Sequence, residues 1–500
     1  MARGLKHACG VFGILGHPEA ARMAYLGLYA LQHRGQESAG IATADLGAMF
    51  VERDMGYVAD VFTEERLEHL PGRTAIGHVR YSTSGDSSLR NAQPVRIESR
   101  NGSIALGHNG NLVNADAIRA DLEKAGAVFT TSSDTEVVLH LFARSECNEA
   151  LDALVDALGR VVGAFSITAM SNEWLIGARD PLGFRPLSIG YLDGAWILAS
   201  ETCAFDLMGA RYIRDVQPGE IVAFHEEAVD NEETLAAVSA GHGAWGAGFR
   251  SLRPWHPRET QHCIFEHVYF ARPDSVLYGT GVQEARQRMG HTLAQEAPAA
   301  ADLVVPVPDG GIYAAQGYAK ESGLPYEMAL IRNHYVGRTF IEPRQAIRHF
   351  GVKVKLNAVR SLIEGKRVIL VDDSIVRGTT SGKIVELIRS AGATEVHWRV
   401  SSPPYVSPCY YGIDTPRREE LVGANHSVQE ICDLIGADSL AYLSLEGLQR
   451  SVPDGDKNYC SACFTAEYPT PLGDELEHQL ELFTPVGAGP AASGKATRRG

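Results

Sequence analysis

The sequence lacks any long apolar run and has no excess of positive charge. No apolar stretch approaches the roughly 18 residues that a bilayer span requires, so we expect no membrane association. The 61 Asp and Glu outnumber the 46 Lys and Arg and give a formal net charge of -15. This balance argues against nucleic-acid binding, which depends on cations that neutralise phosphates. The first residues, MARGLKHA, have the basic start of a secretory signal without its apolar region, and we expect a cytoplasmic protein that acts on small molecules.

Cysteine is also scarce, with eight residues in 500. In a long chain in a reducing compartment, thiols are more often free, catalytic or metal-binding than paired in a disulfide framework. Cys9 lies close to the N-terminus in KHACGVFGILG, before residues that read as a strand, and a buried core position is the common fate of such a thiol. We expect ordinary core or surface positions for three others: Cys147, Cys203 and Cys432.

The remaining four cysteines form a candidate metal-binding set. Cys460 and Cys463 have chelate spacing, whereas Cys263 and Cys409 each stand alone. Four thiolates suit either a structural zinc ion or an iron–sulfur cluster, and spacing does not decide between the two. Four unrelated core thiols are the alternative interpretation.

The chain is long enough for two domains of about 200 to 250 residues, and its pattern changes along the sequence. In residues 9–238, short β-like runs alternate with turns and are interrupted by helical stretches near 21–33 and 134–146, which predicts an α+β domain with helices on stacked antiparallel sheets. Residues 239–262, rich in Gly, His and Trp, predict a linker. Residues 263–470 alternate strand-like and helix-like segments, which predicts an α/β domain with a parallel sheet.

The strongest local signal is RVILVDDSIVRGTTSGKIVELIRSAG, residues 367–392. A β-branched run ends at Asp372 and Asp373, and apolar residues at helical spacing follow from Ile384. The Gly, Ser and Thr loop between them would present unpaired N–H groups and the positive end of a helix dipole to a phosphate. Adjacent carboxylates suit vicinal sugar hydroxyls or a hydrated Mg²⁺. The pattern predicts a site for a phosphate and a ribose, in preference to an ordinary turn with an acidic cap.

This stretch resembles the signature of type I phosphoribosyltransferases, and its residues are most similar to those of the glutamine phosphoribosylpyrophosphate (PRPP) amidotransferase family. The resemblance implies that Asp372 and Asp373 contact the ribose hydroxyls and Mg²⁺. It also implies that the loop after them holds the 5-phosphate, through Ser374, Gly378, Thr379, Thr380 and Ser381.

Residues 333–360 resemble the flexible loop that closes over PRPP in this family. From Arg332 to Arg367 there are nine Lys or Arg against two Glu, in a chain that is acidic overall. Such a local field suits a ligand with several phosphate charges, although a solvated surface loop is the alternative. We expect Arg338 and Lys355 to contact the pyrophosphate.

One position departs from the family pattern. The family usually has a Ser after the Pro-Asp pair of the pyrophosphate loop, where it helps to coordinate Mg²⁺, whereas this chain has Gly310 in VPVPDGGIYAA. That ligand cannot come from this side chain. The backbone amides of residues 309–311 remain able to bind pyrophosphate at the start of the next helix.

The first half resembles the N-terminal-nucleophile glutamine amidotransferases in five segments that occur in the family's order: CGVFGI, LQHRGQESAGI, IGHVRYST, HNGNLVN and SSDTE. A guanidinium matches a carboxylate and an aspartate suits an ammonium, so one of each selects an α-amino acid. His33 and His108 are not needed as the base, because the α-amine of the cysteine takes that role in this family. The resemblance implies Cys9 as nucleophile, Asn109 and Gly110 as the oxyanion hole, and Arg34, Arg80 and Asp134 as glutamine-binding residues.

The two ends of the chain carry separate expectations. Cys9 has no free α-amine while Ala8 is attached, so we expect residues 1–8 to be a propeptide that is removed, as short leaders are in this family. The tail, 471–500, ends in small and polar residues and is expected to be partly disordered.

One branch of the family carries a [4Fe-4S] cluster on cysteines in these contexts, so the resemblance implies a cluster on Cys263, Cys409, Cys460 and Cys463. It also implies a homotetramer, feedback inhibition by purine nucleotides, and a reaction that converts glutamine, PRPP and water into 5-phosphoribosylamine, glutamate and pyrophosphate, the first committed step of purine biosynthesis. Another glutamine amidotransferase and a non-catalytic PRPP-binding regulator are the alternatives.

Overall fold

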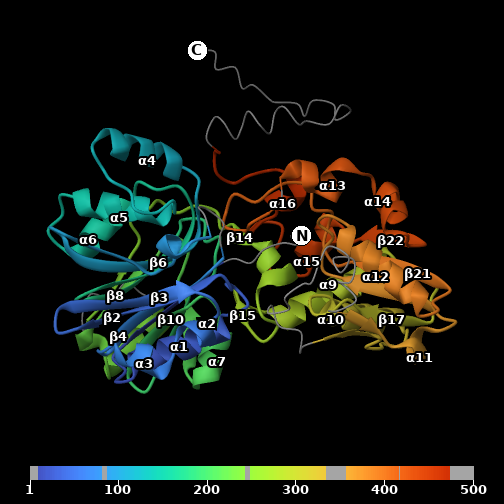
Figure 1. Ribbon diagram of the computed structural model, residues 1–500, viewed down its shortest axis with the longest axis horizontal. Helices are drawn as coiled ribbons and strands as arrows, with labels where there is room; N and C mark the ends of the chain where they lie inside the picture. The colour runs from blue at the N-terminus through green and yellow to red at the C-terminus, as the bar shows by residue number, and fades with distance from the viewer. Residues whose placement is uncertain (1–8, 82–86, 242–247, 334–355, 416, 473–500) are drawn as a thin grey trace, which may run out of the picture.

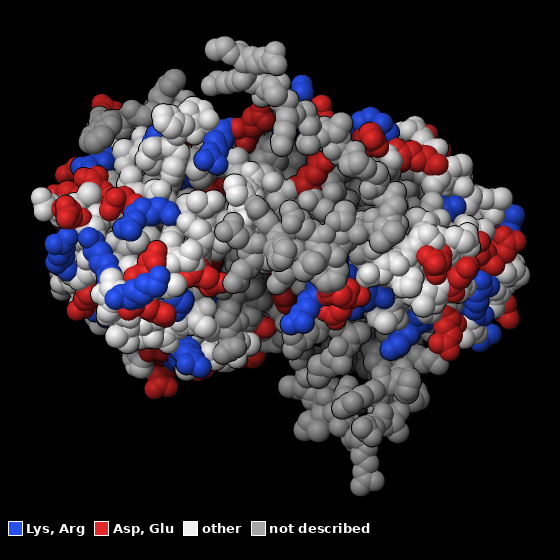
Figure 2. Space-filling model, turned by 90° about the horizontal axis from the view of Figure 1, so that it is seen from above, with Lys and Arg blue, Asp and Glu red and all other residues white. Residues whose placement is uncertain are grey.

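The computed structural model describes residues 9–81, 87–241, 248–333, 356–415 and 417–472. The two halves of the chain form two bodies that lie side by side (Figure 1). None of the helices in the described ranges combines the length and apolar character that crossing a membrane demands. On the face shown in Figure 2, basic and acidic side chains are interspersed over both bodies.

The first body contains two stacked antiparallel sheets, as predicted. Between them lies an apolar core that includes Val11, Ile76, Leu175 and Phe224. In spatial order, the seven-stranded sheet contains β11 (Arg211–Asp215), β9 (Ser188–Leu192), β10 (Ala195–Ala199), β1 (Gly10–Leu15), β4 (Thr74–Arg80), β2 (Ser38–Asp45) and β3 (Ala48–Met55). The six-stranded sheet contains β13 (Phe249–Leu252), β12 (Ile221–His225), β8 (Trp174–Arg179), β7 (Gly163–Ser171), β6 (Gly102–Leu112) and β5 (Val95–Ser99).

Helices cover the outer face of each sheet. The helix α1 (Ala20–Ala30) packs on the first sheet through Ala24 and Leu28, and α5 (Thr135–Arg144) packs on the second through Val138 and Phe142. These are the helices predicted near 21–33 and 134–146. The others are α2 (Val58–Val61), α3 (Glu64–Glu68), α4 (Ala115–Lys124), α6 (Ala150–Leu158), α7 (Cys203–Met208) and α8 (Glu232–Ala240).

The segment predicted as a linker, 239–262, contains a strand of this body. β13 pairs antiparallel with β12, with Phe249 opposite Phe224. Phe249 is buried in the core between the sheets, so burial of this side chain holds the segment in place. A strand of only four residues gave too short a pattern to be recognised in a Gly-rich stretch.

The second body contains a parallel sheet of four strands, in the order β17 (Leu303–Pro306), β20 (Arg367–Asp372), β21 (Glu395–Val400) and β22 (Ser439–Tyr442). Ile369 and Val371 share a core with α9 (Val282–Glu296) and α10 (Ile312–Ser322). Val368 and Leu370 point the other way, into a core with α12 (Thr379–Ser390) and α14 (Val428–Ile435). Side chains alternate along a strand, so these two pairs of residues face opposite sides of the sheet. Helices pack against both sides, and the sheet is buried.

Short elements complete this body and join it to the first. β14 (His262–Cys263) pairs in parallel with β23 (Tyr459–Cys460), and a π-helical turn covers Glu266–Phe270. The remaining described elements are β15 (Val276–Leu277), β16 (Thr280–Gly281), β18 (Leu330–Arg332), β19 (Leu356–Ala358), α11 (Arg360–Ile363), α13 (Val422–Asn425), α15 (Leu445–Arg450) and α16 (Ala462–Thr465), with 3-10 turns at Leu89–Asn91, Glu226–Ala228 and Arg418–Glu420.

Candidate active sites

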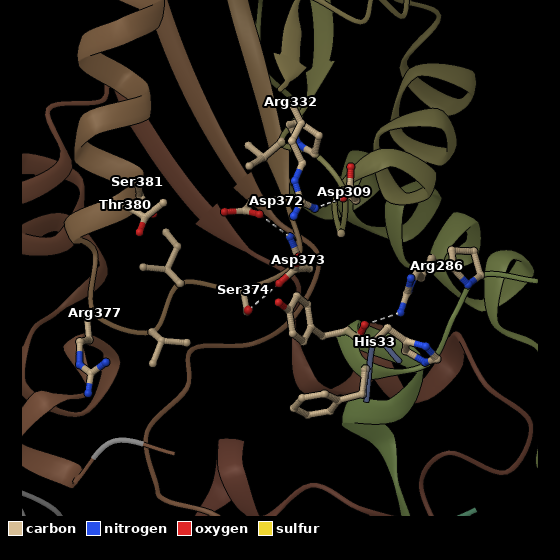
Figure 3. Close-up of a pocket in the computed structure, with 18 of the residues that line it drawn as sticks. His33, Arg286, Asp309, Arg332, Asp372, Asp373, Ser374, Arg377, Thr380 and Ser381 are labelled. Carbon is tan, nitrogen blue, oxygen red and sulfur yellow. Dashed lines mark hydrogen bonds and ion pairs between the residues drawn. The ribbon is translucent and has the colours of Figure 1, made fainter. Parts of the chain in front are cut away.

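The predicted phosphate loop lies between β20 and α12, at the carboxyl edge of the parallel sheet. β20 ends at Asp372, and Gly378 takes a left-handed conformation with φ 73° immediately before the helix begins at Thr379. Ligands bind at this edge of open α/β sheets, where helix N-termini converge. One pocket here brings together the described residues predicted to bind PRPP or Mg²⁺ (Figure 3): Gly310, Asp372, Asp373, Ser374, Gly378, Thr379, Thr380 and Ser381.

The two carboxylates are electrostatically unusual. Burial, together with repulsion from Asp373, raises the pKa of Asp372 well above its ordinary value. Burial also raises the pKa of Asp373 to about 6, although hydrogen bonding from Ser374 and the nearby Arg286 charge act in the opposite direction. The Ser374 hydroxyl donates to Asp373 Oδ1 at 2.6 Å. Two neighbouring carboxylates that repel each other are stabilised by a divalent cation between or beside them.

Gly310 is explained by its contact with Asp373. A Cβ added at Gly310 would overlap the Asp373 carboxylate, so the space that a Ser side chain would need is filled by this acid. Next to it, Asp309 forms an ion pair with Arg332 on the pocket wall. The pyrophosphate loop therefore keeps its backbone without the family's usual hydroxyl.

Two predicted PRPP contacts, Arg338 and Lys355, lie outside the described residues, as does most of the predicted flexible loop. The strands on either side of that loop, β18 and β19, pair antiparallel, with Arg332 opposite Leu356. This pairing fixes both ends of the loop next to the pocket that Arg332 lines.

The pocket also contains residues that no sequence motif places there. His33 and Gln36 come from the first body, whereas Arg286 and Arg377 come from the second. The motif that contains LQHRGQ predicts a place at the glutamine site alone. No signal in one sequence reveals that its His and Gln reach a pocket of the other body.

The predicted nucleophile is buried immediately before β1. The Cys9 thiol donates to the carbonyl oxygen of Tyr81 at 3.4 Å. Burial raises its pKa, whereas the Tyr81 hydrogen bond and the charge of Arg80 lower it. Asp134 also acts on this thiol electrostatically, so the predicted glutamine-binding pair Arg80 and Asp134 lies around it.

The predicted oxyanion hole lies on β6. The Asn109 side chain is fully buried, and neither its Nδ2 nor its Oδ1 has a hydrogen-bond partner in the described ranges. Gly110 follows with φ 150°, and a Cβ there would overlap the carbonyl oxygen of Ala164. A buried amide without a partner is costly, and it is suited to a charge that appears only during reaction.

Arg34 is arranged differently from the expectation that it binds glutamine. Its Nε donates to the Cys9 carbonyl oxygen at 3.0 Å, and its terminal nitrogens bind Glu201 at 2.5 Å and Glu266 at 2.6 Å. All three guanidinium nitrogens therefore have protein acceptors. Arg34 holds the main chain of Cys9 in place, and its guanidinium group is not free to bind a substrate carboxylate.

Arg34 also belongs to a buried ion network between the two bodies. Glu266, from the π-helical turn, binds Arg34 and lies 2.5 Å from the Nη2 of Arg185, and all three side chains are fully buried. Although burial acts to raise it, the charges of Arg185 and Arg34 lower the pKa of Glu266. The ionised carboxylate therefore connects two arginines of the first body to the second.

The four predicted cluster cysteines converge where the two bodies meet. Cys263 lies directly opposite Cys460 in the β14–β23 pair, and its N–H donates to the Phe184 carbonyl oxygen at 3.0 Å. Burial raises the pKa of Cys263 to about 12. Cys460 and Cys463 each interact electrostatically with Cys263 and Cys409. Within the described residues, no group of three or more His, Cys, Asp or Glu is arranged to hold a metal ion.

Two family models match this chain. The glutamine amidotransferase domain matches residues 78–206, and the phosphoribosyl transferase domain matches residues 282–402. These ranges contain, respectively, most of the residues around Cys9 and most of those that line the pocket.

Curated relatives match over nearly the whole chain. The amidophosphoribosyltransferase of Rhizobium etli is 51% identical over 494 residues, which cover 97% of both proteins. That of Bacillus subtilis is 48% identical and covers 94% of this chain and 96% of the relative. Amidophosphoribosyltransferase 1, chloroplastic, of Arabidopsis thaliana is 50% identical and covers 93% of this chain and 79% of the relative.

Solved structures agree with the sequence matches. Glutamine PRPP amidotransferase from B. subtilis, complexed with ADP and GMP, has a TM-score of 0.85 at 47% identity and covers 93% of this chain and 98% of that one. A structure described as the allosteric regulatory enzyme of purine biosynthesis has a TM-score of 0.86 at 47% identity and covers 93% of this chain and 97% of that one.

Proposed function

The chain belongs to the amidophosphoribosyltransferase family, and from that membership we propose how its residues divide the reaction. The enzyme makes 5-phosphoribosylamine, glutamate and pyrophosphate from glutamine, PRPP and water, the first step of purine biosynthesis. The first body carries glutamine hydrolysis and the second carries the transfer to PRPP. The observation that carries this assignment is the presence in one chain of a buried cysteine on which the charges of Arg80 and Asp134 act and of a pocket lined by Asp372 and Asp373.

In the first half-reaction, the Cys9 sulfur attacks the side-chain amide of glutamine. Arg80 binds the α-carboxylate and Asp134 binds the α-ammonium, so the substrate amide faces the thiol. The oxyanion that forms accepts from Asn109 Nδ2 and Gly110 N–H, which are buried where water cannot compete. The thioester is then hydrolysed to glutamate, after ammonia has left.

The base in this step is the α-amine of Cys9. Its ordinary pKa near ~8 suits proton transfer at neutral pH. The amine becomes free when the bond between residues 8 and 9 is cleaved. Residues 1–8 lie outside the described ranges, and their removal is part of this proposal. N-terminal sequencing of the active enzyme tests it, because a fully active protein that still begins at residue 2 would contradict it.

In the second half-reaction, the loop from Ser374 to Ser381 binds the 5-phosphate through backbone N–H groups and hydroxyls. The Asp372 and Asp373 carboxylates bind the ribose hydroxyls. Ammonia attacks C1 and pyrophosphate leaves from the side of Asp309 and Arg332. Arg338 and Lys355 are proposed to reach the pyrophosphate when the loop closes.

Magnesium fits the donor set of this pocket. The carboxylates of the half-buried Asp372 and the buried Asp373 have raised pKa values, and their charge is costly without a cation nearby. Asp372 and Asp373 would hold Mg²⁺, and Gly310 contributes no side-chain ligand. When bound, the ion neutralises phosphate charge on PRPP.

An iron–sulfur cluster is proposed on Cys263, Cys409, Cys460 and Cys463. The support is their convergence: one buried and three half-buried thiols with raised pKa values lie within electrostatic range of one another. A single zinc ion needs all four sulfurs at about 2.3 Å, whereas a cluster distributes them around four irons. We assign the cluster a structural role, because none of these cysteines is among the residues that line the pocket of Asp372 and Asp373. Brown anaerobic protein that bleaches in air supports the cluster, and colourless protein with stoichiometric zinc contradicts it.

Regulation and assembly complete the proposal. The B. subtilis relative was solved with ADP and GMP, and we propose that purine nucleotides inhibit this enzyme as well. We also propose a cytoplasmic homotetramer, on the basis of the family resemblance. Light scattering with and without a purine nucleotide measures the mass of the assembly and any change in that mass when the nucleotide binds.

The decisive experiment separates the two half-reactions. Cys9→Ser should abolish PRPP-dependent glutamate release and retain pyrophosphate release from PRPP with ammonium chloride. Cys203→Ser, at another buried thiol of the first body, serves as the matched control and should keep both. Glutamate release independent of PRPP would favour another amidotransferase, and loss of neither activity in Cys9→Ser would overturn the assignment.

A further inference from the structure

Tyr405 is a fully buried tyrosine close to the predicted cluster cysteines. Its side chain is 1% exposed, and its hydroxyl has no hydrogen-bond partner among the residues that the structure describes. The hydroxyl of a buried tyrosine usually finds a partner, because an unpaired one has lost its hydration without compensation. The surroundings of this hydroxyl therefore indicate what it is placed to bind.

Packing holds the Tyr405 ring beside Cys463. The ring lies edge-on to Phe265 and Phe464, with ring centroids 5.6 and 6.0 Å apart. Phe464 directly follows Cys463, and the main-chain N–H of Val406 donates to the Cys463 carbonyl oxygen at 2.9 Å. Tyr405 and Cys463 also belong to one apolar core. Because aromatic rings and main chain fix the tyrosine, its hydroxyl has little freedom to seek a partner elsewhere.

Three of the predicted cluster cysteines act on this hydroxyl. Burial, and after it the charges of Cys463, Cys409 and Cys263, raises the pKa of Tyr405 well above its ordinary value. The hydroxyl therefore keeps its proton and remains a hydrogen-bond donor. A donor thus lies within electrostatic range of three converging thiols.

Arg185 of the first body brings a positive charge to the same cysteines. Its side chain is fully buried, and its Nε and Nη1 have no hydrogen-bond partner in the described part of the chain. Burial raises the pKa of Cys263, Cys409 and Cys460, and the charge of this arginine opposes that effect. The preceding residue, Phe184, accepts from the main-chain N–H of Cys263 at 3.0 Å. A buried cation and a buried donor around four thiols suit an anionic centre that is rich in sulfur.

We propose that the Tyr405 hydroxyl donates a hydrogen bond to a sulfur of the cluster and thereby protects the cluster from oxidation. This inference rests on the proposed [4Fe-4S] cluster on Cys263, Cys409, Cys460 and Cys463. Tyr405 is not an iron ligand and acts through the sulfur that accepts its proton.

The effect follows from the charge on the sulfurs. A hydrogen bond to sulfur withdraws electron density and favours the reduced, more negative form of a cluster, so it raises the reduction potential. The same bond makes loss of an electron to dioxygen less favourable. For a cluster with a structural role, the consequence is a longer lifetime in air.

Tyr405→Phe tests this role because it removes the hydroxyl and keeps the ring that packs against Phe265 and Phe464. The variant and wild type should be purified anaerobically and compared at equal iron and acid-labile sulfide content. We expect a more negative midpoint potential in a redox titration, equivalent to about a threefold to tenfold shift of the equilibrium toward the oxidised form. We also expect the visible absorption to bleach about tenfold faster in air.

Tyr442→Phe is the matched control. The Tyr442 hydroxyl is also buried without a described partner, but the charge that acts on it is that of Asp372. This variant should match wild type in both measurements, neither of which depends on turnover of glutamine or PRPP.

Three results would count against the proposal. A wild-type potential and bleaching rate in Tyr405→Phe would overturn the inference. Faster bleaching of Tyr405→Phe at an unchanged potential would also overturn it, because it would show loosened packing and no hydrogen bond to the cluster. Stoichiometric zinc in place of iron in the wild-type protein would overturn the proposed cluster itself, and with it this role of Tyr405.

Discussion

At the scale of single residues, the contact between Gly310 and Asp373 determines where the Asp373 carboxylate lies in the pocket. The Asp373 carboxylate occupies the space next to the Gly310 Cα and is held there by Ser374. The side chain is buried, so it has little freedom to move aside. The residue type at position 310 and the position of the acid are therefore linked.

Gly310→Ser, although it restores the residue usual in the family, should lower PRPP turnover. The new Cβ forces Asp373 from its position, and overpacking of this kind costs about 1–3 kcal/mol. We expect ammonia-supported kcat/KM for PRPP to fall about tenfold or more. Gly281→Ser is the control, because a Cβ there first meets Glu284 at an ordinary 3.5 Å. Unchanged or improved turnover in Gly310→Ser would contradict the argument.

Protons should compete with Mg²⁺·PRPP at Asp373. The pKa of this carboxyl, raised to about 6, means that it is largely ionised at pH 7 and largely protonated at pH 5. A protonated carboxyl does not bind Mg²⁺, so affinity should be lost as the pH falls through 6, by about tenfold between pH 7 and pH 5. Calorimetry at pH 6 in buffers of different ionisation enthalpy should detect proton release.

Asp373→Asn provides the control for that measurement, because protons released by PRPP itself persist in the variant. The contribution of Asp373 is the difference between the two proteins. Equal proton release from both would show that this carboxyl does not titrate on binding.

At the scale of elements, α9 and α10 approach each other through glycines. A Cβ at Gly290 would overlap the Ala314 carbonyl oxygen, and one at Gly317 would overlap that of Gln287. These contacts are backbone to backbone, so neighbouring side chains cannot relax to make room. The pair covers the face of the parallel sheet that contains Ile369 and Val371.

Gly290→Ala should therefore destabilise the second body, despite the better helix propensity of Ala. We expect urea denaturation to show a loss of about 1–3 kcal/mol. Gly382→Ala, in α12, meets no atom closer than 3.7 Å and should be neutral or stabilising by up to about 1 kcal/mol. A stabilised Gly290→Ala protein would mean that the two helices can move apart without cost.

Local patterns predicted the elements better than the contacts between them. The unit of β20, its loop and α12 was predictable because strand, turn and helix signals follow one another within residues 367–392. The two antiparallel sheets and the parallel sheet were also confirmed. The pairing of Cys263 with Cys460 joins two-residue strands that are distant in sequence, and no local pattern encodes it. For the same reason, the contact of Glu266 with Arg34 and the position of His33 in the pocket of the second body were not predictable.

At the scale of the whole molecule, the two bodies are joined by buried charges. Arg34 and Arg185 of the first body meet Glu266 of the second, and none of the three is exposed. Removing one member of a buried ion set is costly because the remaining charges lose their compensation. The interface is thus sensitive to single substitutions.

Glu266→Ala should lower the free energy of unfolding by about 3–5 kcal/mol, as measured by urea denaturation followed by tryptophan fluorescence. It should also weaken glutamine hydrolysis, because Arg34 loses a partner that fixes it on the Cys9 carbonyl. Glu284→Ala removes an exposed carboxylate whose ion pair with Arg288 is 3.7 Å long and should change stability by less than about 1 kcal/mol. Equal stability of the two variants would exclude a supporting role for the buried network.

The pairing of β14 with β23 also constrains the order in which contacts form during synthesis of the chain. Ribosomes extend chains from the N-terminus, so Arg34 and Arg185 emerge well before Glu266, and Cys263 emerges well before Cys460 and Cys463. The pair can therefore form only after Cys460 has been synthesised. Arg34, which holds the Cys9 main chain, meets Glu266 earlier in synthesis, before most of the second body exists. Filling of the proposed cluster site thus follows support of the Cys9 main chain in the order of synthesis.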